Sequence, residues 1–438
     1  MNPSSHLPSR HNWRHDRAFW AIFALAAVLG VVYNFVILLE YAPDEPRHMA
    51  YVRLLVDERR LPFLLPNGSE YGGAHSLHPP LYYLVLAPFF TIFRAVLGEN
   101  GWHLSRLVSL AMGLASLPLF YEIAQRISAN RGVARLVVAQ IALLPMFGMT
   151  VGAINNDASA LLAFAVFLWL LVVRFENDFS ARAALWLGLA LGAGSLCKAT
   201  VIIADVGALV AFLVFKRGAK GVFTFPRLAL FGIGAAILAL PWYVRNYAMY
   251  GKFSPIESGY SSPALPDPAQ GILVMMMHDN FPSLFLIANS SLFNTLWSQK
   301  DWFPETIRSQ IYGVLAIFSL LALAGHALKR WRAKNADAAS HDTHANASKF
   351  AAYGAFALCW AACLWMALFR HWGWAEGGRY LLIGLGGFSL FLALGWQGLV
   401  GEARLKTVLI GWSLLALSLN VVSIYWLVSY LNPTFGPK

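Results

Sequence analysis

The sequence predicts an all-α protein that crosses a membrane many times. Of its 438 residues, 58% are hydrophobic and only 13% are charged, whereas an ordinary soluble domain carries about 25% charged residues. Apolar stretches of roughly 20 residues, the length of a membrane-spanning helix, recur from one end of the chain to the other. These observations exclude a soluble enzyme with a single membrane anchor, and they also exclude a disordered chain.

Eleven segments have the length and the composition of a spanning helix. The first follows Arg10, Arg14 and Arg17. Its apolar stretch of about 22 residues is longer than that of a signal peptide, so we interpret it as an uncleaved anchor. The expected spans lie near residues 18–39, 104–125, 134–153, 158–174, 183–197, 199–215, 226–244, 307–328, 350–368, 379–397 and 405–428.

The segment 80–97 decides the topology, because it is long enough to cross but contains Pro88 and Arg94. If it does not cross, 19 of the 33 Lys and Arg residues lie in short cytoplasmic loops, as the positive-inside rule favours. We therefore expect a re-entrant or interfacial 80–97 and about 11 spans, within a range of 11–13. We expect a multi-pass protein of the plasma (inner) membrane, with its N-terminus in the cytoplasm. The long loops 40–78 and 245–306 are extracytoplasmic.

The remaining composition excludes several other classes of protein. The formal net charge of +11 is scattered over short loops, which membrane topology explains without a nucleic-acid partner. The three cysteines, Cys197, Cys359 and Cys363, lie in apolar segments, where a thiol behaves as a small hydrophobe. Neither a disulfide-built secreted domain nor a zinc ribbon fits this pattern.

Charged and amide side chains gather at the extracytoplasmic ends of the predicted spans. A charged residue at membrane depth costs about 2.5–3.5 kcal/mol on insertion scales, so each one calls for a reason. The topology rests on lysine and arginine counts, yet it brings distant polar motifs to one membrane surface. They are Asp44-Glu45-Pro46, Asn155-Asn156-Asp157, Lys198, Arg245-Asn246, and the stretch from Arg370-His371 through Glu376 to Arg379-Tyr380.

The first external loop begins with two adjacent carboxylates, Asp44 and Glu45. Residues 46–60 follow with an apolar stripe and charged residues elsewhere, which is typical of an amphipathic helix at the membrane interface. Carboxylates at this position either cap the helix or serve a function, and a carboxylate at the membrane boundary suits a general base. His48 lies one helical turn beyond them.

The same loop returns to the membrane through Glu70-Tyr71 and His78-Pro79-Pro80-Leu81-Tyr82-Tyr83. The two prolines fix the path of the chain. Tyr82 and Tyr83 stand where interfacial aromatic residues anchor a membrane protein, so Tyr83 is either an anchor or a site residue. His78 is a further candidate for the site.

Lys198 lies in a very short turn between two apolar spans, so it needs an anionic partner or a path to water. Snorkelling is the alternative, but the short turn gives its side chain little reach. Arg245, Arg370 and Arg379 add cations on the same side, and arginine binds phosphate bidentately. This set predicts a phosphorylated ligand, and a lipid phosphate fits its position at the interface. Asp205, inside a predicted span, has no assigned role.

At these residues the chain resembles the GT-C superfamily of membrane glycosyltransferases. It is most similar to the branch with the protein O-mannosyltransferases and the lipid A aminoarabinose transferases. The resemblance covers about the first 250 residues and residues 376–380. It rests on Asp44-Glu45 with the following PRHMAY, Glu70-Tyr71 with His78 to Tyr83, Asn155-Asn156-Asp157, Cys197-Lys198-Ala199-Thr200, Pro241 to Asn246 with Tyr250-Gly251, and Gly378-Arg379-Tyr380.

The resemblance implies a polyprenyl-phosphate sugar donor, a glycan, lipid or protein acceptor, and transfer with inversion at the extracytoplasmic face. It implies that Asp44, with Glu45 beside it, is the catalytic base and that Lys198 contacts the lipid phosphate. We expect Arg245, Arg379, His78 and Tyr83 to help bind the donor. His48, Glu70, Asn156, Asp157 and Arg370 are expected in supporting positions.

The resemblance also implies a division of the chain. Residues 1–250 would form the catalytic transmembrane module, 251–306 the second external loop and 307–438 the C-terminal spans, with no separate soluble domain. Some relatives bind a divalent metal, and His278-Asp279 with Glu45 or Glu70 is one ligand set, which the spacing does not support. No cofactor is therefore assigned. His341 and His344 are interpreted as part of a solvated loop.

Two other classes of function compete with a transferase. A transporter or flippase of lipid-linked sugars would show internal repeats and broken helices near the membrane midplane, and no repeat is visible. A polysaccharide polymerase or ligase would place its key residues in a late external loop rather than in the first one.

Overall fold

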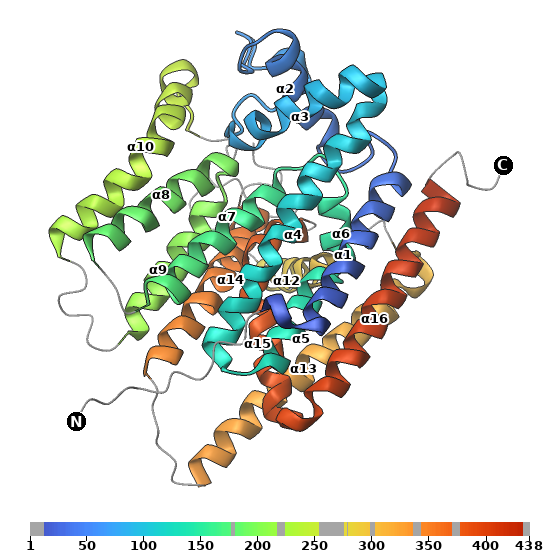
Figure 1. Cartoon of the computed structure of the whole chain (residues 1–438), viewed down its shortest axis with the longest axis vertical. Coiled ribbons are helices and arrows are strands. Elements are labelled where there is room, and N and C mark those ends of the chain that lie inside the picture. Colours follow the sequence, from blue (N-terminus) through green and yellow to red (C-terminus); the bar gives the residue numbers. More distant parts are fainter. Residues whose placement is uncertain are drawn as a thin grey trace.

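The computed structural model describes residues 13–176, 180–216, 224–253, 276–277, 279–297, 303–335, 343–369 and 377–431. Helices dominate these ranges, and the only bridge of β type there is an isolated one between Leu64 and Glu70. The predicted all-α fold is therefore confirmed. Figure 1 shows the longer helices side by side in one bundle, with α2 and α3 at one end of it.

The helices follow the predicted spans along the chain. They are α1 Arg17–Val36, α2 Glu45–Asp57, α3 Leu81–Leu97, α4 Gly101–Ser128, α5 Arg131–Ala142, α6 Pro145–Val151, α7 Asp157–Trp169, α8 Ala181–Cys197, α9 Val201–Phe215, α10 Phe225–Tyr250, α12 Phe281–Trp297, α13 Glu305–Asn335, α14 Thr343–Phe369, α15 Leu385–Val400 and α16 Leu405–Trp426. Short 3-10 turns include η2 Tyr71–Gly73, η3 Gly98–Asn100 and η8 Gly378–Gly384.

Among the described residues, eight helical segments are long and apolar enough to cross a membrane, or nine if α5 and α6 are one bent span. Two further apolar helices, α8 and α9, have only 17 and 15 residues. Every predicted span coincides with a helix, but the expected count of eleven crossings is not confirmed.

The amphipathic helix expected after the first span is present as α2. Its buried side includes Met49 and Val52, whereas Arg47 and Arg53 are exposed. The adjacent helix α3 lies along α2, because contacts join both of its ends to α2. Tyr83 stacks on Tyr51 at one end, and Arg94 donates a hydrogen bond of 2.6 Å to Asp57 at the other.

Glycines allow the closest approaches between helices in the bundle. A Cβ atom added to Gly325 of α13 would lie 1.9 Å from the carbonyl oxygen of Gly395 in α15. In the same way, Gly207 of α9 faces Gly354 of α14, where an added Cβ atom would be 2.8 Å from the carbonyl oxygen. Small residues are the usual means by which membrane helices pack backbone to backbone.

One helix was not predicted. The segment 245–306 was expected to be a loop, but it contains α12, whose Leu292, Leu296 and Trp297 are buried. The Oγ1 atom of Thr295 accepts a 3.0 Å hydrogen bond from the backbone amide of Gly378. This contact connects α12 to η8, which carries part of the site described next.

Candidate active site

Asp44 is held in the short turn between α1 and α2. Its backbone is left-handed, with φ of 64°, and its side chain makes no capping hydrogen bond to α2. The carboxylate instead accepts a hydrogen bond from the guanidinium of Arg379, which also donates to the Pro43 carbonyl at 3.1 Å. Burial would raise the pKa of Asp44, but Arg379, with His75 and Lys198, lowers it to about 2.

Glu45 has a different environment, although it is the next residue. It is fully buried, and its two carboxylate oxygens accept hydrogen bonds of 2.8 and 2.6 Å from Arg106. The backbone amide of Ile154 donates a third bond at 2.8 Å. Arg106 also donates to the Asn34 and Ile37 carbonyls at the end of α1. This pair therefore joins α1, α2 and α4 behind Asp44.

Three histidines, His48, His75 and His78, lie close to Asp44. The Nε2 atom of His75 is 4.0 Å from an Asp44 carboxylate oxygen, and its ring stacks on that of His78 with centroids 4.0 Å apart. His48 of α2 lies 5.0 Å from His75, centroid to centroid. Burial is the main cause that places the pKa of both His48 and His78 well below 6.5.

Tyr83 joins these histidines to the start of α3. Its hydroxyl lies 2.7 Å from Nδ1 of His48 and 3.4 Å from Nδ1 of His78. The side-chain amide of Asn156 is also 3.4 Å from Nδ1 of His78. Tyr83 is fully buried, so it is not an exposed interfacial anchor.

Lys198, in the break between α8 and α9, forms an ion pair with Asp157 at the start of α7. Both side chains are almost entirely buried, and Oδ2 of Asp157 has no hydrogen-bond partner within the described residues. The ammonium of Lys198 lies 5.0 Å from the ring centroid of Tyr380, and the guanidinium of Arg379 lies 5.1 Å from the same ring. Tyr380 thus stands between the two cations.

These contacts form a continuous series that returns to its start. Asp44 pairs with Arg379, which contacts Tyr380, which contacts Lys198, which pairs with Asp157. Asn156 precedes Asp157 and contacts His78, which stacks on His75 beside Asp44. The sequence-predicted residues Asp44, Lys198, Arg379, His78, Asn156 and Asp157 therefore lie together.

Two predicted residues lie at the margin of this group. Arg245 stacks on Trp242 and donates to the Pro62 carbonyl at 3.0 Å, so it holds the first loop against α10. Glu70 accepts a 3.2 Å hydrogen bond from the Ser76 amide and lies 3.9 Å from Nδ1 of His75. It therefore supports the turn that carries His75.

Some expected residues lie outside the described part of the chain. They are Arg370, His371, Glu376 and His278, together with His341 and the side chain of His344. Asp279, the neighbour of His278, is exposed.

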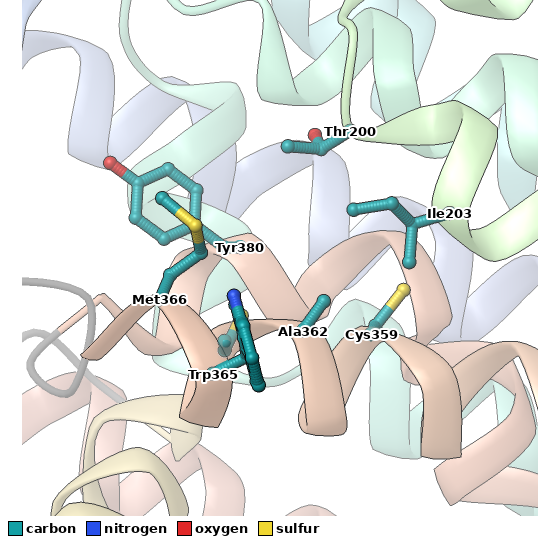
Figure 2. A pocket seen from close by; sticks show the side chains of 8 residues that line it. Thr200, Ile203, Cys359, Ala362, Trp365, Met366 and Tyr380 are labelled. Atoms are coloured by element: carbon teal, nitrogen blue, oxygen red, sulfur yellow. The ribbon is translucent and has the colours of Figure 1, made fainter. Parts of the chain in front are cut away.

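An apolar pocket of about 190 Å³ adjoins Tyr380. Figure 2 shows Ile203 of α9 and Thr200, the residue before that helix, across from Cys359 and Ala362 of α14, with Tyr380 at one end. Trp365 and Met366 complete this part of the wall. Cys363 also lines the pocket. The pocket therefore offers an apolar surface next to the two cations.

Sequence reasoning missed two residues of the site. Arg106 lies inside a predicted span, and the rule that singled out Lys198, the cost of a charge at membrane depth, applies equally to it. His75 stands three residues before His78 in a loop. No feature of the sequence around His75 singles it out, because its place in the site depends on its contact with His48 of α2.

Comparisons with known proteins agree with this architecture. Residues 77–244 match the model of the dolichyl-phosphate-mannose-protein mannosyltransferase family. The curated proteins give no match. An oligosaccharyltransferase from Archaeoglobus fulgidus, tethered with an acceptor peptide, is 13% identical with a TM-score of 0.52, and the match covers 97% of this chain and 56% of that one. At this identity the likeness concerns the fold alone.

A second solved structure is ArnT from Cupriavidus metallidurans bound to undecaprenyl phosphate. It is 16% identical with a TM-score of 0.43, and the match covers 87% of this chain and 78% of that one. The family match covers residues 77–244, which is less than half of the chain, so it is over those residues that this chain is similar to the mannosyltransferase family.

Proposed function

We propose that this protein transfers a sugar from a polyprenyl-phosphate donor to an acceptor hydroxyl at the extracytoplasmic membrane face. One observation carries the proposal. Arg379 and Lys198 flank Tyr380, and Tyr380 also lines the apolar pocket between α9 and α14. A polyprenyl-phosphate donor has the same two parts, an anionic phosphodiester head and an apolar chain. The family match supports the same class of donor.

In this proposal Asp44 is the general base. Its side chain is 38% exposed, whereas the Glu45 side chain is fully enclosed and occupied by Arg106. A base needs access to the proton that it removes. Glu45 therefore acts as a positioning residue that fixes the turn carrying Asp44.

The reaction needs little covalent chemistry from the protein. The acceptor oxygen attacks the anomeric carbon, its proton passes to Asp44, and the bond from that carbon to the phosphate oxygen breaks. The electron pair leaves with the lipid phosphate, whose added negative charge Arg379 and Lys198 stabilise. Attack opposite to the leaving phosphate inverts the anomeric centre.

The ion pairs also suggest how the donor prepares the site. Arg379 pairs with Asp44, and Lys198 pairs with Asp157. A donor phosphate would compete with these carboxylates for the two cations, since arginine forks bind phosphate bidentately. When Arg379 turns to the phosphate, Asp44 loses its strongest stabilising partner and becomes a better proton acceptor. His78, Tyr83 and Asn156 would then shape the space beside the sugar.

The test is a transfer assay on the full chain reconstituted in liposomes with a panel of polyprenyl-phosphate sugars and candidate acceptors. We expect one donor to release its sugar with wild type, and Asp44→Asn to reduce the rate by at least ~100-fold, a general-base effect. The variant should bind the lipid phosphate at least as well, because Arg379 loses its internal competitor.

A matched control separates the base from its neighbour. Glu45→Gln keeps the size of the side chain but weakens the pair with Arg106, so we expect lower thermal stability with most of the activity of the folded fraction retained. Sugar release that is unchanged in Asp44→Asn would refute the assigned base. Movement of intact donor across the bilayer without transfer would instead favour a flippase.

A further inference from the structure

Three imidazoles meet beside Asp44 in a way that donor binding does not explain. His48 comes from α2, whereas His75 and His78 come from the turn after η2. One ring nitrogen of each lies within 4.8 Å of those of the other two.

One of these nitrogen atoms is left without a partner. His75 is 7% exposed, and its buried Nε2 atom has no hydrogen-bond partner within the described residues. A buried polar group without a partner costs about 1–3 kcal/mol. This atom lies 4.0 Å from a carboxylate oxygen of Asp44.

We propose that His48, His75 and His78 bind a divalent transition-metal ion such as Zn²⁺. Zinc lies about 2.0–2.1 Å from each histidine nitrogen, so tetrahedral geometry places the nitrogens roughly 3.4 Å apart. The nitrogens already lie within 4.8 Å of one another, but the stacked rings of His75 and His78 are parallel, so one of them must turn about its Cβ–Cγ bond before both can bind the same ion. The unpartnered nitrogen of His75 then becomes a ligand.

Neighbouring polar groups contact ring nitrogens of these histidines, as is usual for imidazoles that bind a metal. The Tyr83 hydroxyl is 2.7 Å from Nδ1 of His48, which leaves Nε2 of that ring for the ion. Glu70 lies 3.9 Å from Nδ1 of His75 and is itself held by the Ser76 amide. A carboxylate behind a ligating histidine fixes the ring and increases its basicity.

Three histidines leave one position open on a tetrahedral ion, as in catalytic zinc sites. A carboxylate oxygen of Asp44 lies 4.0 Å from Nε2 of His75. If the proposed function holds, an acceptor hydroxyl on the ion would lose its proton more readily to Asp44. Metal binding itself does not depend on that function.

Co²⁺ binding tests the site directly. The full chain, purified in detergent without a histidine tag and stripped with a chelator, is titrated with Co²⁺ in the absence of any donor. We expect one equivalent to bind with the intense visible absorption of tetrahedral Co²⁺. His75→Gln should weaken binding by at least ~100-fold, since removing a ligand costs more than the 10–100-fold of an outer partner.

Two further variants keep the result interpretable. His326→Gln removes a half-buried histidine in α13 that bonds the Phe391 carbonyl, and it should bind Co²⁺ as wild type does. If His75→Gln fails to fold, Glu70→Gln serves in its place, with an expected loss of about 10–100-fold. No stoichiometric binding by wild type, or equal binding by the folded variants and wild type, overturns the proposal. Because no donor is present, this failure is distinct from failure of the transfer assay.

Discussion

Asp44 and Glu45 are adjacent in the sequence, and the two residues differ in what surrounds them. Arg106 and the Ile154 amide use both oxygens of Glu45, while Asp44 has a single strong partner and partial access to solvent. From the sequence alone, both carboxylates were candidates for the catalytic base. The choice between them depends on Arg106, which is 61 residues away in the chain and whose contacts cannot be read from local pattern.

The buried ion pair between Lys198 and Asp157 predicts how variants of either residue change thermal stability. Lys198→Met strands the Asp157 carboxylate, and breaking a buried pair costs about 3–5 kcal/mol. We therefore expect a lower melting temperature in detergent. The double variant Lys198→Met/Asp157→Asn removes both charges and should regain most of the stability.

Affinity for a polyprenyl phosphate separates the role of Lys198 from its structural pairing. The double variant should bind the lipid at least ~10-fold more weakly than wild type, since a charge-assisted bond is worth about 1.5–3 kcal/mol. Asp157→Asn should bind it at least as tightly as wild type, because it frees the ammonium. A folded double variant with wild-type affinity in a lipid-binding titration would remove Lys198 from the phosphate site.

The helices α9 and α14 form the walls of the apolar pocket, and their spacing depends on glycine. Gly207→Val places atoms against the Gly354 carbonyl and Leu358, where a single Cβ atom already comes within 3.0 Å. Overpacking of this kind costs about 1–3 kcal/mol. We expect lower thermal stability and at least ~10-fold weaker donor binding, since the walls must separate.

Gly232→Val in α10 is the matched control, because an added Cβ atom there meets no atom within 4 Å. Its melting temperature and its affinity for the donor, measured in the same titration, should stay at the wild-type level. Wild-type donor binding by Gly207→Val would show that the lipid chain lies elsewhere.

At the scale of elements, hydropathy predicted the helices well because burial in a bilayer imposes apolar composition locally. Each predicted span coincides with a helix, and the amphipathic helix after the first span is α2. The helix α12 was missed because its polar residues, such as Asn289 and Asn294, interrupt an apolar run of only 17 residues. The pocket between α9 and α14 was also beyond prediction, since it depends on how two distant helices pack.

The whole molecule has two chemically different ends. Figure 1 shows α2 and α3 at one end and the turn between α15 and α16 at the opposite one. The basic residues Arg332 and Lys334 end α13 in that second region, where the sequence places cytoplasmic loops. The candidate site lies toward the first end, beside the turn between α1 and α2 that carries Asp44.

This arrangement predicts the side of the membrane that each end faces. Because contacts join both ends of α3 to α2, we expect α3 to stay with α2 and not to cross the membrane. The three native cysteines are buried, so a new exposed one reports its own position. In intact spheroplasts, a membrane-impermeant maleimide should label Asn67→Cys, and it should label Ala403→Cys only after the membrane is opened. If α3 did cross, every later segment would change sides, and Ala403→Cys would be labelled from outside together with Asn67→Cys.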